Sequence, residues 1–196
     1  MKKYLMILSL LFATTIAFAI DYSCFEEKCY FTDSDNYLYP SSFQIYYSVE
    51  LECYYISQED GGIIISDETI RQIRAAYEKY VEWEEIAVKN KVTIEKKIPV
   101  TATAVVFWVG AHGDVGMSAL ELKFYIFSQS TSKHQFIISA DKAYDFLGDG
   151  SLYFEMKEIY LNKDQAEKLY NDLSSDSLKK QQEIIKKKIE VDSLFN

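Results

Sequence analysis

Apolar and polar residues alternate along most of this chain, and that period of two is typical of β-strands that bury one face. Six stretches are strand candidates: residues 24–31, 43–57, 100–109, 117–128, 134–139 and 151–161. Most carry polar or charged residues on the face opposite the apolar one, as in antiparallel sheets with one wet face. Residues 100–109 are apolar on both faces and predict a more central strand. Glycines fall in three clusters between the stretches, where turns are needed.

Three regions have helical spacing instead. Residues 67–89 place apolar side chains every three to four positions, and Ser66 or Asp67 can cap the first turn. A second helix begins at Asn162, which has capping-box spacing with a glutamine three residues later. A third covers residues 176–190. This order predicts an α+β fold: an antiparallel sheet of about five to six strands, with one long helix and C-terminal helices packed on one face.

The N-terminus has the features of a secretory signal peptide. Two lysines, Lys2 and Lys3, precede an apolar run over residues 5–19 that ends in Ala17-Phe18-Ala19. Small residues at these positions are what signal peptidase recognises, and the run is shorter than the ~20 residues of a membrane-spanning helix. We expect a signal peptide over residues 1–19, a single domain over residues 20–196, and export to the periplasm or exterior of a bacterial cell. The exported chain should have no stable membrane insertion.

The charge of the chain is acidic and uneven. The formal net charge is −9, and loss of Lys2 and Lys3 with the signal peptide leaves −11. Nine carboxylates lie between residues 20 and 60, against one lysine. Such a surface repels phosphate backbones, so nucleic acid is not an expected partner.

Three cysteines follow the expected cleavage point: Cys24, Cys29 and Cys53. An oxidising compartment favours one disulfide and leaves one thiol over. Cys53 is in phase with the apolar face of residues 43–57, so we expect a Cys29–Cys53 disulfide, worth about 3 kcal/mol for a loop of roughly 25 residues. A Cys24–Cys29 pair is the alternative if a turn joins them.

The most suggestive polar segment is the glycine-rich loop that follows Trp108 and contains His112 and Asp114. A histidine and a carboxylate at this spacing can bind a metal or serve as a base and its partner. Strand patterns on both sides favour a hairpin turn. His134 is the other histidine, and no HxxxH or CxxC pattern is present, so we expect neither a metal nor a cofactor.

Tyrosines are the remaining candidates for function. Tyr46 and Tyr54 fall on the polar face of residues 43–57, where they could stack on sugars or anchor a protein. The first hypothesis is an exported, non-catalytic binding or interaction domain for a protein or glycan partner. The alternatives are a small exported hydrolytic enzyme centred on the His112/Asp114 loop and a structural component of the envelope. The candidate binding residues are Tyr46, Tyr54, Trp108, His112 and Asp114.

Signal-peptide cleavage gives the first testable prediction. N-terminal sequencing of the protein recovered from the culture medium or periplasm should begin at Ile20, because Ala17 and Ala19 occupy the small-residue positions before that bond. An exported chain that still begins at Met1 would contradict the prediction.

Overall fold

The fold is that of a computed structural model, which describes residues 21–32, 35, 37–58, 61–109, 115–144 and 153–194. The expected signal peptide and most of the loop with His112 and Asp114 lie outside these residues. The strands are β1 (Asp21–Thr32), β2 (Leu38–Ser48), β3 (Cys53–Gln58), β4 (Gly61–Ile65), β5 (Glu95–Val109), β6 (Val115–Ser130), β7 (Lys133–Ala140), β8 (Ala143–Tyr144), β9 (Tyr153–Phe154) and β10 (Ile159–Leu161). The helices are α2 (Asp67–Asn90), α3 (Lys163–Asp172) and α4 (Ser175–Asp192).

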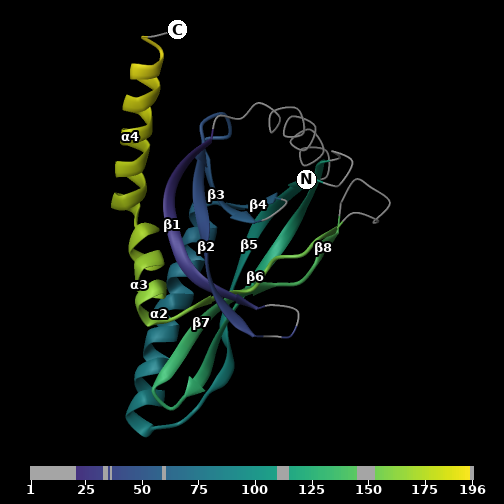
Figure 1. Cartoon of the computed structure of the whole chain (residues 1–196), viewed down its shortest axis with the longest axis vertical. Coiled ribbons are helices and arrows are strands. Elements are labelled where there is room, and N and C mark those ends of the chain that lie inside the picture. Colours follow the sequence, from purple (N-terminus) through teal and green to yellow (C-terminus); the bar gives the residue numbers. More distant parts are fainter. Residues whose placement is uncertain are drawn as a thin grey trace.

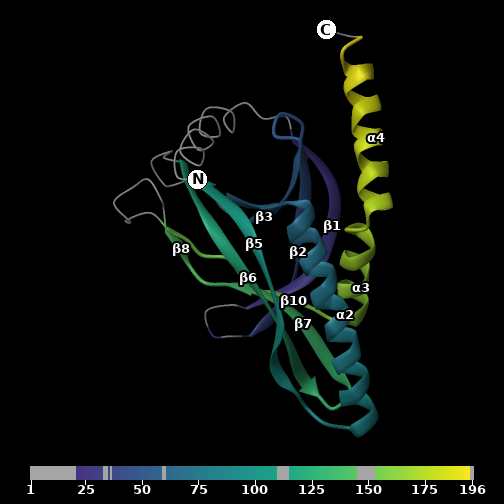
Figure 2. The same cartoon turned by 180° about the vertical axis from the view of Figure 1, so that it is seen from behind.

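Eight of these strands form one closed, antiparallel barrel in the order β1-β10-β7-β6-β5-β4-β3-β2. Figure 1 shows most of these strands, and β10 is labelled in the view from behind in Figure 2. The short strand β10 closes it, since it pairs with β1 at Tyr30 and Tyr160 and with β7 over three residue pairs. Strands β8 and β9 form a separate two-stranded sheet. The mixed fold with a large antiparallel sheet is therefore confirmed. The expected count of five to six strands is wrong, because the described residues contain eight strands in the barrel alone.

The stretch 43–57 accounts for part of that difference. It does not form one strand, because residues 49–52 turn between β2 and β3 and Glu52 takes a left-handed conformation with φ of 49°. Ser48 then pairs with Cys53, and Tyr46 pairs with Tyr55. Paired residues of an antiparallel ladder face the same side, so the turn places Tyr46 on the side of Tyr55 and not of Tyr54.

The three predicted helices are confirmed, and their caps explain where they begin. Ser66 is the N-cap of α2, where its Oγ accepts a hydrogen bond of 3.1 Å from the Thr69 amide. Asn162 and Gln165 form a capping box at the start of α3. Each side chain accepts a hydrogen bond from the other residue's backbone amide, at 3.0 and 2.8 Å. These bonds satisfy amides that the first helical turn leaves free.

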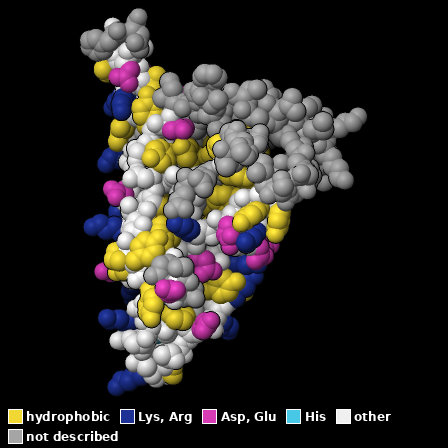
Figure 3. Space-filling model, turned by 45° about the vertical axis from the view of Figure 1, so that its right-hand side comes forward, with side chains coloured by type: hydrophobic (Ala, Val, Ile, Leu, Met, Phe, Trp, Pro, Cys, Tyr) yellow, Lys and Arg dark blue, Asp and Glu magenta, His cyan; other side chains and the backbone are white. Residues whose placement is uncertain are grey.

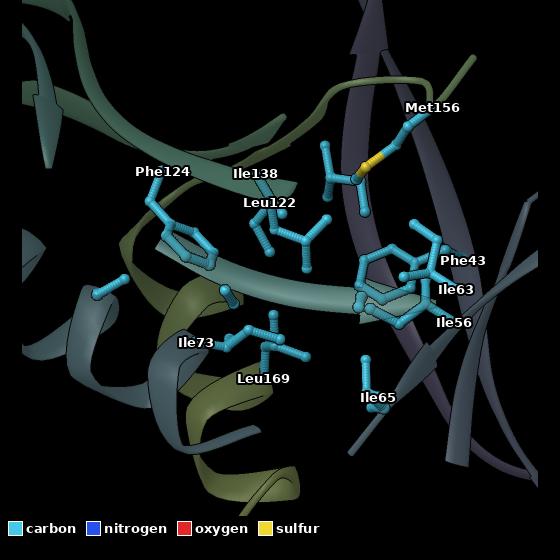
Figure 4. Packing of buried hydrophobic residues seen from close by; sticks show 14 of the residues in the cluster. Phe43, Ile56, Ile63, Ile65, Ile73, Leu122, Phe124, Ile138, Met156 and Leu169 are labelled. Atoms are coloured by element: carbon cyan, nitrogen blue, oxygen red, sulfur yellow. The ribbon is translucent and has the colours of Figure 1, made fainter. Parts of the chain in front are cut away.

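The helices and the sheet share one hydrophobic core. Helices α2, α3 and α4 lie along the same side of the barrel in two opposite views (Figures 1 and 2). Ile73 of α2 and Leu169 of α3 point toward strand residues such as Leu122, Phe124 and Ile138 (Figure 4). All five are at most 1% exposed. We call the sheet face that carries these strand residues the core face, and the opposite one the outer face.

Helix α3 is fixed to β1 through a buried carboxylate. Glu27 is 0% exposed, and its Oε1 accepts a hydrogen bond of 2.8 Å from Lys168 Nζ. Lys168 also donates to the Asp172 carboxylate at 2.7 Å and to the Glu26 carbonyl at 3.1 Å. Burial is the main cause that raises the pKa of Glu27 to about 7, and the neighbouring Asp172 carboxylate raises it further while Lys168 opposes the shift.

This raised pKa predicts that stability depends on pH near neutrality. Native Glu27 binds its proton more tightly than in the unfolded chain, where its pKa is 4.5. The contribution is complete below pH 4.5 and is lost as the pH rises through 7. Relative to Glu27→Gln, which keeps an uncharged side chain, the wild type should lose on the order of 2–3 kcal/mol of unfolding free energy across that window. Urea unfolding from pH 4.5 to 8 measures it.

The matched control is Glu26→Gln, which changes a neighbouring exposed carboxylate on the outer face of β1. Its unfolding free energy should follow that of the wild type at each pH. Parallel curves for wild type and Glu27→Gln would show that the Glu27 proton has no part in stability.

Candidate binding site

Tyr46 lies on the outer face and belongs to a short aromatic row. Its ring stacks on Tyr55, with ring centres 5.3 Å apart and planes at 15°, and Tyr55 meets Phe107 edge-on at 5.4 Å. Gly62 makes room for this contact, because a Cβ there would come within 2.6 Å of the Phe107 ring. The Tyr55 hydroxyl donates to the Asp21 carboxylate at 2.9 Å. We call the two tyrosines Tyr46 and Tyr55, together with the adjoining Phe107, the upper tyrosine row.

The expected outer-face position of Tyr54 is wrong. Tyr54 is 6% exposed, its hydroxyl donates to the Leu178 carbonyl of α4 at 2.8 Å, and its ring packs against Tyr47. The turn at residues 49–52 is the cause, because it shifts the alternation by one residue between β2 and β3. Tyr54 therefore anchors a helix and offers no surface to a partner.

Trp108, expected beside a polar loop site, is part of the core at 3% exposed. Its ring occupies the space above Gly116, where a Cβ would approach to 2.3 Å, and it packs against Phe154 with ring centres 6.1 Å apart. His112 and Asp114 lie outside the described residues. The structure thus assigns Trp108 a packing role and brings no described histidine to it.

The expected Cys29–Cys53 disulfide is wrong, because the described cysteines are all free thiols. Cys29 is opposite Ser41 of β2 and Cys53 is opposite Ser48 of the same strand. These partners are seven residues apart, roughly 23 Å along a strand, whereas bonded cysteines have Cα atoms within about 7 Å. Burial raises the pKa of the Cys29 thiol to about 12 and of Cys53 to about 11, which disfavours the thiolate form of both.

A hollow of about 350 Å³ lies on the outer face of β6, β7 and β10. It is lined by Thr32, Leu38, Glu95, Tyr125, Ile126, Phe127, Ile137, Glu158 and Tyr160. We call it the aromatic pocket, because three partly exposed rings line it: Tyr125, Phe127 and Tyr160. Figure 3 shows hydrophobic side chains interspersed with both acidic and basic ones on one face of the molecule.

Strand register brings these side chains together. Tyr125 pairs with Ile137 across β6 and β7, and Ile137 pairs with Tyr160 across β7 and β10. The three therefore form one row on the outer face, while neighbouring Phe124, Ile138 and Leu161 fill the core. A signal for half of this site was present in the sequence, because Tyr125 and Phe127 occupy positions where a wet strand face usually carries polar residues. Glu158 and Tyr160 carried no such signal in the sequence. Residues 151–161 read as one strand there, whereas the structure has a separate short strand, β10, at their end.

Two carboxylates border the aromatic pocket. Glu158 is fixed, because its Oε1 accepts from the Ser139 hydroxyl and its Oε2 from the Tyr160 hydroxyl, each at 2.7 Å. Glu95 is exposed and pairs across the strands with Phe127. Burial, the bond to Glu158 and the charges of both carboxylates raise the pKa of Tyr160, which keeps its phenol neutral. No lysine or arginine is among the described residues that line this pocket.

A second, more polar hollow of about 460 Å³ lies beyond Leu38, which lines both. His134 and Gln135 line it at the end of β7 that β10 does not cover. His134 Nδ1 is 2.6 Å from the Ser128 hydroxyl, but its Nε2 has no hydrogen-bond partner. Gln135 is 4% exposed and pairs with Phe127, and its side-chain oxygen has no partner either. Such buried atoms are uncommon in folded proteins and are frequently satisfied by a ligand or an ordered water.

The largest of these hollows, about 650 Å³, lies between α2 and the start of α4 and is a less suitable site. Long polar side chains line it, and Arg74 is already engaged. Its guanidinium donates to the Tyr170 carbonyl and lies 3.7 Å from the centre of the Tyr170 ring. This hollow is a seam between helices whose polar groups stabilise the packing.

Among the described residues, no group of three or more His, Cys, Asp or Glu side chains could hold a metal ion. None of the helices described is long and apolar enough to cross a membrane. No protein-family model, curated protein or solved structure matches the chain. The function of the aromatic pocket is therefore inferred from the side chains that line it.

The anchoring role of Tyr54 gives a prediction about stability. Tyr54→Phe should lower the free energy of unfolding by about 1–3 kcal/mol, because it leaves the Leu178 carbonyl without its buried donor. Tyr46→Phe is the matched control and should change stability by less than about 0.5 kcal/mol, because it removes a hydroxyl from a partly exposed ring. Urea unfolding followed by circular dichroism measures both. Equal losses in the two variants would contradict the opposite placement of these tyrosines.

Proposed function

We propose that the chain is an exported, non-catalytic binding domain that takes a small ligand in the aromatic pocket. The observation that carries the proposal is the convergence of three partly exposed rings and two carboxylates on one hollow. They come from β5, β6, β10 and the residue before β10. Ligand sites in proteins are concave, largely apolar and aromatic, and contain a few fixed polar groups. The aromatic pocket has each of these features.

The rigidity of the pocket also supports binding. Tyr125, Ile137 and Tyr160 stand on paired strands of a closed sheet, and Glu158 is held by two hydroxyl groups. Side chains that are already ordered lose little conformational entropy when a ligand arrives. The upper tyrosine row is a weaker candidate for a small ligand, because its rings already stack on one another.

A ligand screen by NMR tests the location. The ¹⁵N-labelled mature chain should be titrated with small oligosaccharides, peptides and metabolites, and true ligands should shift the amide signals of Tyr125, Phe127 and Tyr160. Tyr125→Ser should weaken each of these ligands about tenfold or more, because it removes one wall of the pocket. Tyr46→Ser, which removes a ring of the upper tyrosine row, should leave their affinity unchanged.

The opposite pattern would overturn the assignment. Ligands whose binding survives Tyr125→Ser and is lost with Tyr46→Ser would move the site to the upper tyrosine row. Turnover of a bound compound into a product would exclude a purely binding role.

A further inference from the structure

We propose that the ligand of the aromatic pocket is a small organic cation, an amine or ammonium compound whose charged nitrogen lies among Tyr125, Tyr160, Glu95 and Glu158. This inference rests on the proposed function and adds the chemical class of the ligand. Two properties of the described residues lead to it: two carboxylates and no lysine or arginine line the pocket, and the buried side-chain oxygen of Gln135 in the neighbouring hollow has no donor.

The charge of the pocket favours a cation. Glu95 and Glu158 line it, and no described lysine or arginine does. Two lysines lie on the same outer face close to Tyr125. Lys97 is exposed and pairs with Tyr125 across β5 and β6, outside the pocket lining, and Lys123 is paired with the Asp141 carboxylate. Two carboxylates beside low-polarity walls would repel a carboxylate or phosphate ligand and attract an ammonium group.

The aromatic walls suit a cation as well. The face of a phenol or phenyl ring carries partial negative charge and attracts an ammonium group placed within about 6 Å of its centre. This attraction strengthens when the site excludes water, and Tyr125, Phe127 and Tyr160 are all partly buried. The rings and the carboxylates of the pocket thus both favour a positively charged ligand.

Hydrogen bonding gives independent support. Gln135 lies next to Phe127 across the β6–β7 ladder, and its buried side-chain oxygen has no donor. An oxygen that lacks a donor is satisfied by an N–H or O–H group and not by an anion. Gln135 lines the neighbouring hollow and not the aromatic pocket, so a protonated amine brings an N–H donor to it only if the ligand extends past Leu38. Lys133 and Lys163 also line that hollow, and Lys163 is paired with Glu84.

Benzylammonium and benzyl alcohol form a suitable pair of probes, because they have nearly the same shape and differ in charge. Titrated into the ¹⁵N-labelled mature chain, benzylammonium should shift the signals of Tyr125, Phe127 and Tyr160 and bind at least about tenfold more tightly than benzyl alcohol. Glu95→Gln and Glu158→Gln should each weaken benzylammonium by about threefold to tenfold and leave benzyl alcohol unchanged. Glu95 is exposed, so its variant carries little risk to folding.

Glu121→Gln is the matched control. Glu121 is an exposed carboxylate on the same face of β6, outside the pocket lining, so its loss should not change benzylammonium binding. An equal effect of all three variants would reveal attraction by net charge alone and overturn the specific site.

The other outcomes separate this inference from the proposed function. Equal affinities for the two probes at the pocket signals would overturn the cationic ligand and leave a binding pocket in place. Binding of neither probe would also overturn it, while the wider ligand screen would still decide whether the pocket binds at all. Binding only of peptides that contain lysine would replace the small amine with a protein partner.

Discussion

The strict alternation of side chains in a closed sheet is the constraint on which the rest of this structure depends. Every barrel strand gives one face to the core, where residues such as Ile45, Leu122 and Phe124 are fully buried. A closed sheet has no free edge, and helices α2, α3 and α4 lie along one side of it. Strand residues of the aromatic pocket therefore come from the outer face, and strand register decides which of them become neighbours.

The same constraint explains why one turn moves a predicted site residue. Alternation continues through residues 43–57 in the sequence, so the pattern predicts both Tyr46 and Tyr54 on the polar face. Residues 49–52 reverse the chain, and pairing then places Tyr46 beside Tyr55 and turns Tyr54 toward α4. No glycine or proline marks this turn, which forms with Glu52 in the left-handed region, a conformation uncommon outside glycine and asparagine. The local pattern therefore gave no signal of the reversal.

Local chemistry was predictable from the sequence where it depends on near neighbours, and unpredictable where it depends on distant ones. The caps at Ser66 and Asn162 bond to amides three residues away, and both helices begin where the spacing predicts. The disulfide and the aromatic pocket depend instead on which strands pair and in what register. Cys29 and Cys53 are far apart for that reason, and Glu158 reaches Tyr125 only because the three-residue β10 pairs with β7.

Strand β10 links the stability of the barrel to the composition of the pocket. It closes the sheet with few pairs, and Tyr160 on its outer face contributes both a pocket wall and the hydroxyl that orients Glu158. The chain passes directly from β10 into α3, whose Lys168 holds the buried Glu27 of β1. The path of the chain thus connects the outer pocket to the Glu27–Lys168 contact on the core face through β10 and α3.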